Sequence, residues 1–123
     1  MKYYRLDIDS KNSVEIYNKI TEILGVKPTE FETTKPEFLY SLWSYAIEEN
    51  EEDETPYYDF INNFLDIVEP KFKELKKIGV KKKNISFWLN YEYDQQCGME
   101  FHPKEMKRLG KSGIVMCIDC WQK

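Results

Sequence analysis

The residues best suited to chemistry lie in the last third of this 123-residue chain. That stretch contains the single histidine, His102, and all three cysteines, Cys97, Cys117 and Cys120. Together they offer the four ligands of a tetrahedral zinc site. The Cys-x-x-Cys spacing of 117 and 120 is also typical of a redox dithiol. Both kinds of site require the side chains to converge on one point.

Strand geometry argues against convergence. Residues 113–121 are predicted to form a strand, in which side chains three positions apart point to opposite faces. No helix follows Cys120 to lower a thiol pKa, as a thioredoxin-type motif requires. We therefore interpret Cys117 and Cys120 as small apolar side chains buried in the fold. We expect no metal ion and no other cofactor.

His102 has a structural interpretation as a helix cap. It precedes Pro103, which suits the first helical position, and Glu105 follows three residues later, where it can accept from the backbone N–H of the cap. A functional role for His102 beside this one stays open. No serine or cysteine sits in a nucleophile turn, so the sequence gives a catalytic triad little support.

Carboxylates offer a second route to catalysis. Glu92 and Asp94 lie two residues apart on one strand face, and Asp7 and Asp119 lie on strands that could adjoin. A hydrolase or a metal-dependent phosphoryl enzyme could use such a group, with a cleft near the hairpin at 94–100. A solvated sheet face with ordinary charges is the simpler interpretation, and a carboxylate-based or metal-dependent hydrolase is the alternative function.

The elements that position these residues alternate between strands and helices. A helix is predicted to begin at an Asn12 cap and to end at Gly25. A second begins at Thr55-Pro56, restarts at Pro70 and ends before Gly79. A third runs from Pro103 to Gly110. Strands are predicted at 3–9, 38–47, 85–93, 99–101 and 113–121, and the second of these, apolar on both faces, is expected to be central.

This order predicts an α+β fold. We expect a two-layer sandwich, with a four- to five-stranded mixed or antiparallel sheet and helices mainly on one face. Two similar helix ends, Leu24-Gly25 and Leu109-Gly110, leave a ferredoxin-like arrangement of two related halves open. The length fits a single domain over residues 1–123.

Composition and charge exclude several classes of protein. Hydrophobic residues make up 41% of the chain and aromatic residues 15%, as in globular domains. The sequence contains no run of about 18 apolar residues, which is the length needed to span a membrane, and the N-terminus lacks a secretory signal. The odd number of cysteines argues against a disulfide framework. We therefore expect a cytoplasmic protein.

The charges are unevenly distributed along the chain. The net charge is −4, six of the seven positions from 48 to 54 are acidic, and seven lysines lie between 71 and 83. Such runs are usually solvated. The overall acidity disfavours nucleic acid as a partner and favours a basic protein.

The polar face of the predicted sheet is the candidate binding surface. Tryptophan and tyrosine beside carboxylates are typical of protein interfaces. Alternatively, a loop of the same chain or a second copy in a homodimer covers Trp88 and Trp121. By strand parity this face presents Tyr3, Arg5, Asp7, Trp88, Asn90, Glu92, Asp119 and Trp121.

Parts of the chain resemble a bacterial family catalogued as domain of unknown function 4279. The similar stretches are Phe87 to Phe101, Pro103 to Leu109 and Ile114 to Trp121, with Leu24 to Glu30 near the N-terminus. The resemblance implies a small cytoplasmic bacterial α+β domain and carries no catalytic residue with it. The function expected from the residues is a non-catalytic module that binds a basic partner, for example an immunity protein that neutralises a cationic toxin.

Overall fold

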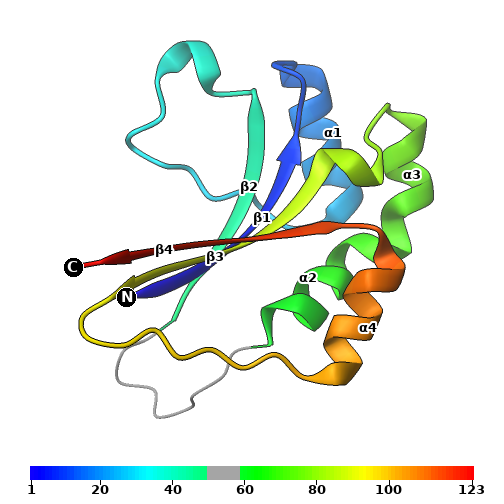
Figure 1. The fold of residues 1–123 in the computed structure, drawn as a ribbon. Coiled ribbons are helices and arrows are strands. Elements are labelled where there is room, and N and C mark those ends of the chain that lie inside the picture. The colour runs from blue at the N-terminus through cyan, green and yellow to red at the C-terminus, as the bar shows by residue number, and fades with distance from the viewer. Residues whose placement is uncertain (50–58) are drawn as a thin grey trace.

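A four-stranded mixed sheet with helices on one face organises the protein (Figure 1). The computed structural model describes residues 1–49 and 59–123. The strand order is β2-β1-β3-β4; β1 is antiparallel to both of its neighbours, and β3 is parallel to β4. The strands are β1 (Lys2–Asp9), β2 (Leu42–Glu48), β3 (Ile85–Tyr93) and β4 (Val115–Gln122). The predicted α+β class is confirmed.

A helix lies between each strand and the next along the chain, whereas a ferredoxin-like unit joins two of its strands directly. Among the described residues, no helix combines the length and apolar composition needed to cross a membrane. The helices are α1 (Val14–Leu24), α2 (Phe60–Val68), α3 (Phe72–Lys77) and α4 (Pro103–Ser112), and the short 3-10 turns are η1 (Pro36–Phe38), η2 (Glu69–Lys71) and η3 (Lys82–Asn84).

The core lies between the sheet and the helices. Leu6 and Ile8 of β1 point to this side and are fully buried. Phe64 of α2 packs edge-on against Phe87 of β3, with 5.5 Å between ring centroids. Trp43 of β2 is fully buried, and its indole N–H donates to Thr21 Oγ1 at 3.0 Å. Because strand side chains alternate, these same strands present their other side chains on the face without helices.

One predicted helix start was wrong, and another lies outside the described residues. Ser13 caps α1, since its hydroxyl accepts from the Ile16 N–H at 3.2 Å. The prediction of Asn12 was wrong, and Asn12 instead has φ +52° in the turn before the cap. The predicted Thr55-Pro56 start lies outside the described residues; α2 begins at Phe60, with Asp59 as its cap.

The predicted chain breaks are otherwise close to those observed. Gly25 takes the left-handed conformation after α1, as predicted, and η2 separates α2 from α3 at Pro70. Helix α4 continues past Gly110 to Ser112, so the predicted end was wrong. A glycine within a helix costs only about 1 kcal/mol, and Gly113 supplies the left-handed position at φ +75°.

The second strand was predicted too early and in the wrong place. Pro36 opens the η1 turn, so β2 begins only at Leu42. The strand lies at an edge of the sheet, not at its centre, because β1 pairs with β2 on one side and β3 on the other. Residues 99–101, predicted as a strand, form none. The last strand covers Val115–Gln122, slightly later than predicted.

Candidate binding surface

The strand register gathers all eight predicted surface residues on the face that the helices leave open (Figure 1). Tyr3 lies opposite Asn90 across the β1–β3 pair, and Arg5 lies opposite Trp88. On the other side of β3, Asn90 lies beside Asp119 and Glu92 lies beside Trp121. Asp7 continues the same face of β1. We call this set of eight residues the open face.

The open face has a buried floor and an exposed rim. Asp7 and Asn90 are each only 3% exposed. Asp119 and Trp121, on the edge strand β4, are exposed. Tyr3, Arg5, Trp88 and Glu92 are intermediate. The β4 residues are therefore the most accessible part of the open face.

The floor contains a polar network centred on Asp7. The Ser44 hydroxyl donates to Asp7 Oδ1 at 2.7 Å, and Arg5 Nη2 lies 3.1 Å from Asp7 Oδ2. Burial raises the pKa of Asp7, while the bonds from Ser44 and Arg5 act in the opposite direction. The carboxylate is thus engaged by its own chain.

Arg5 also covers Trp88. Its guanidinium carbon lies 5.3 Å from the centroid of the Trp88 ring, and the Trp88 indole N–H donates to Ser86 Oγ at 3.0 Å. Trp88 is therefore partly covered by its own chain, whereas Trp121 is 36% exposed. Within the described part of the chain, Arg5 Nε and Asn90 Nδ2 are buried donors without an acceptor. Unsatisfied groups of this kind weaken a fold.

A groove adjoins the open face on the β2 side. It has a volume of about 1160 Å³ and lies between the segment 29–42 and the β1–β2 half of the sheet. The Thr29 N–H donates to the Ser44 carbonyl at 2.8 Å, and the Ala46 N–H donates to Thr29 Oγ1 at 3.0 Å. These bonds fix the segment to the outer edge of β2. The groove was not predicted, because residues 38–41, which line part of it, were expected to form a strand.

The proposed carboxylate group does not assemble as expected. Asp7 lies on β1 and Asp119 on β4; both strands adjoin β3, the strand of Glu92, but β3 separates them from each other. Two strand spacings put them about 10 Å apart laterally. Glu92 lies beside Trp121, and Asp94 is exposed beyond the end of β3.

Cys117 and Cys120 lie on opposite faces of β4, as predicted. Cys117 lies beside Trp88 on the open face, and Cys120 lies beside Tyr91 on the helix side. The prediction that they are buried was wrong, because Cys120 is exposed and Cys117 is only half-buried. Desolvation and nearby Cys97 and Asp119 raise the pKa of Cys120, which disfavours a reactive thiolate. No three His, Cys, Asp or Glu side chains in residues 1–49 and 59–123 form a group that could hold a metal ion.

His102 caps α4, as predicted. Its backbone N–H donates to Glu105 Oε1 at 2.6 Å, and Pro103 is the first helical residue. The His102 ring is exposed at the surface, 3.7 Å from Glu100. The geometry thus accounts for the position of His102 through the backbone of the helix start.

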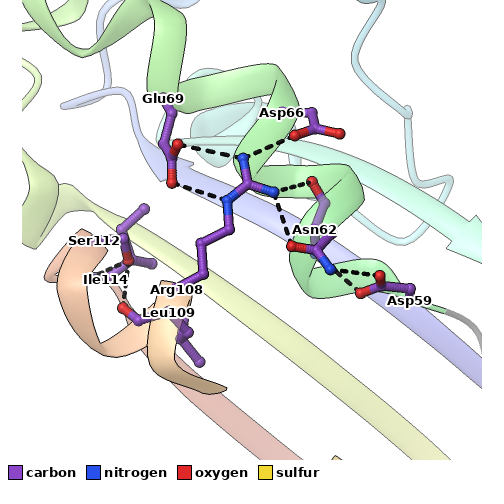
Figure 2. Close-up of polar contacts among 8 residues, drawn as sticks. All are labelled: Asp59, Asn62, Asp66, Glu69, Arg108, Leu109, Ser112 and Ile114. Carbon is purple, nitrogen blue, oxygen red and sulfur yellow. Dashed lines mark hydrogen bonds and ion pairs between the residues drawn. The ribbon is translucent and has the colours of Figure 1, made fainter. Parts of the chain in front are cut away.

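A second polar cluster joins α4 to α2 and was not foreseen (Figure 2). Arg108 of α4 contacts both carboxylate oxygens of Glu69, at 3.2 and 3.3 Å, and Asp66 at 2.8 Å. It also donates to Asn62 Oδ1 at 2.8 Å. The bonds to Glu69 and Asp66 raise the pKa of Arg108. Among the described residues, every acceptor of this arginine belongs to α2 or η2, so the cluster fixes these helices to α4.

The protein is thus a two-layer α+β domain with one polar, largely open sheet face. Within that class it belongs to the family described as Domain of unknown function (DUF4279), whose model matches residues 16–123. This agrees with the resemblance found in the sequence. No curated protein and no solved structure matches the chain.

Proposed function

We propose that this protein is a non-catalytic binding module that engages a basic protein partner through the open face. The observation that carries the proposal is the placement of the four α-helices of the described residues, α1 to α4, on one side of the sheet. That placement leaves aromatic and acidic side chains together on the other side. Trp121 and Asp119 form the exposed part of this surface. Aromatic anchors with charged neighbours are typical of interface hot spots.

Charge supports a basic partner. The chain carries a net charge of −4, and Glu92 and Asp119 lie on the open face next to Trp121. The one arginine of the open face, Arg5, is paired with Asp7. Acidic surfaces steer basic proteins and raise association rates in a salt-dependent way. An immunity-type protein that neutralises a cationic toxin is one concrete form of this function.

A carboxylate-based hydrolase has less support. Such an enzyme needs two carboxylates on either side of a substrate, or a carboxylate free to move a proton. Asp7 is buried and bonded to Ser44 and Arg5. Asp7 and Asp119 lie on strands that do not adjoin. The open face is thus better suited to contact than to catalysis.

The test is affinity purification from the native host with matched charge reversals. Wild type should retain a basic protein in stoichiometric amount, which elutes as the salt concentration rises. Asp119→Lys should retain less than a tenth as much, because it reverses a charge on the exposed rim. Glu15→Lys makes the same change on α1, in the helix layer, and should behave as wild type. A partner retained equally by Asp119→Lys, or no partner at any salt concentration, would refute the proposal.

The exposed tryptophan gives a second arm to this experiment. Trp121→Ala should abolish retention while changing the free energy of unfolding by less than about 1 kcal/mol, since an exposed side chain on an edge strand stabilises little. A large loss of stability in Trp121→Ala, measured by urea denaturation, would instead place this side chain in the core.

A further inference from the structure

We propose that the groove beside β2 binds one extended segment of the basic partner. The segment carries an aromatic or aliphatic anchor at the Leu42 end and lysine or arginine at the Glu48 end. This inference rests on the proposed function, because it assigns one part of the binding surface to one part of the partner. It adds the segment 29–42 and the outer face of β2, which the open face does not include.

The shape of the groove follows from the side chains of β2. Leu42, Ser44, Ala46 and Glu48 alternate along one face of the strand and line the groove. The small residues Ser44 and Ala46 lie in the middle of the strand, between the larger Leu42 and Glu48. The floor of the groove is therefore low in its middle. From Leu42 to Glu48 the strand spans about 20 Å at roughly 3.3 Å per residue, which is the length of an extended segment of about six residues. The volume of about 1160 Å³ exceeds that of most small-molecule pockets.

One end of the groove is apolar and open to water. Phe38 is 55% exposed, Leu39 47% and Leu42 45%, and all three line the groove. Tyr40 lies beside them and packs edge-on against Tyr17 of α1, with ring centroids 5.2 Å apart. Several exposed apolar side chains that line one groove are typical of a docking site. This end is therefore suited to an apolar anchor.

The charges that line the groove are mainly acidic. Glu30, Glu32 and Glu48 contribute to its walls and floor. The positive groups in the lining are already engaged: Arg5 pairs with Asp7, and the N-terminal ammonium of Met1 donates to the Glu92 carbonyl at 2.8 Å. Charge complementarity thus favours lysine or arginine in the bound segment and disfavours an acidic one.

Selection from a random twelve-residue peptide library on phage, against the full chain, tests this inference. Enriched peptides should combine an aromatic or aliphatic cluster with at least two lysines or arginines. Ala46→Trp fills the middle of the groove and should weaken the binding of these peptides at least tenfold. Met106→Trp places the same side chain on the exposed surface of α4 and should leave binding unchanged. Fluorescence anisotropy of labelled peptides gives the dissociation constants.

A second variant keeps the test decisive if Ala46→Trp does not fold. Replacing Glu30 and Glu32 with glutamine retains the shape of these exposed side chains, and it should weaken the basic peptides at least fivefold at low salt. Failure to enrich any peptide, enrichment of acidic peptides, or binding that neither variant affects would overturn the inference.

Two further outcomes separate this inference from the proposed function. Asp119→Lys could weaken the binding of the selected peptides while Ala46→Trp leaves it unchanged. The peptides would then bind the open face over β3 and β4, so the groove would lose its role while the proposed function stood. A wild-type dimer that Ala46→Trp converts to a monomer in light scattering would assign the groove to a second copy and overturn the inference.

Discussion

The Asp7 carboxylate lies in the buried floor of the open face, between the Ser44 hydroxyl and the Arg5 guanidinium. Burial raises its pKa above the ordinary value of 3.8, although both neighbours oppose the shift. At a pH between the ordinary pKa of 3.8 and the raised pKa of the folded state, the native state holds the proton while the unfolded chain releases it. The contribution of Asp7 to the free energy of unfolding therefore falls as the pH rises through this interval, and it stays low at higher pH.

Asp7→Asn should reveal this dependence, because asparagine keeps an acceptor for Ser44 and cannot ionise. The free energy of unfolding of the variant minus that of wild type should increase as the pH rises from below 3.8, then level off. Urea denaturation at a series of pH values measures this difference. Asp119→Asn, at an exposed position, controls for the general loss of one negative charge. A difference that is constant with pH, or that decreases, would contradict the assignment.

Strand parity was sufficient to place the eight side chains of the open face together, since alternation depends only on local backbone geometry. Their burial was not predictable in the same way. Asp7 is covered through contacts with Ser44 of β2, 37 residues later in the chain. The partial cover of Trp88 by Arg5 likewise depends on the β1–β3 register. Both the burial of Asp7 and the partial cover of Trp88 therefore depend on pairing between strands that are distant in sequence.

At the level of elements, substitutions at two glycines three residues apart test where α4 ends. Gly110 is an exposed residue inside the helix, and an added Cβ there meets nothing within 4 Å. Gly110→Ala should raise the free energy of unfolding by about 0.5–1 kcal/mol. Gly113 has φ +75°, so Gly113→Ala should lower it by about 1 kcal/mol. Thermal or urea unfolding measures both, and the opposite pair of signs would move the helix end back to Gly110.

The junction between α4 and α2 depends on the geometry of Arg108. Arg108→Lys keeps the charge but loses the paired contacts with Glu69, and it should lower the free energy of unfolding by about 1–2 kcal/mol. The side chain is 31% exposed, so solvent screening keeps the effect in this range. Lys107→Ala, its exposed neighbour, should change stability by less than about 0.5 kcal/mol. Equal effects of the two substitutions in urea denaturation would exclude a special role for Arg108.

The elements that the sequence predicted well carry strong local signals. Strand β3 has a clear alternation and occurs at the predicted residues 85–93. The start of α4 has both a proline and a capping glutamate. Strand β2 was harder because aromatic residues on both sides of residue 41 resemble one continuous strand. Its place at the sheet edge depends on long-range pairing, for which the chain holds no local pattern.

For the whole molecule, the central pairing joins residues that are far apart in sequence. Tyr4 of β1 pairs with Leu89 of β3, and the β3–β4 pair is parallel and must wait for α4 to cross over. Loop closure on this scale costs entropy before the contacts form, so refolding should take milliseconds to seconds. Stopped-flow fluorescence of tryptophan, including the fully buried Trp43, measures the rate. Refolding within microseconds would contradict this expectation.

The same pairing has a consequence during synthesis. Strand β1 is synthesised before the other strands of this sheet and becomes an inner strand, yet its partner β3 is complete only at Tyr93. Until then the apolar side chains of Tyr4, Leu6 and Ile8 lack the β3 side chains beside which they pack. An incomplete chain of this kind exposes an aggregation-prone strand to the neighbouring nascent chains on the polysome. We therefore expect it to be a substrate for a chaperone that binds nascent chains.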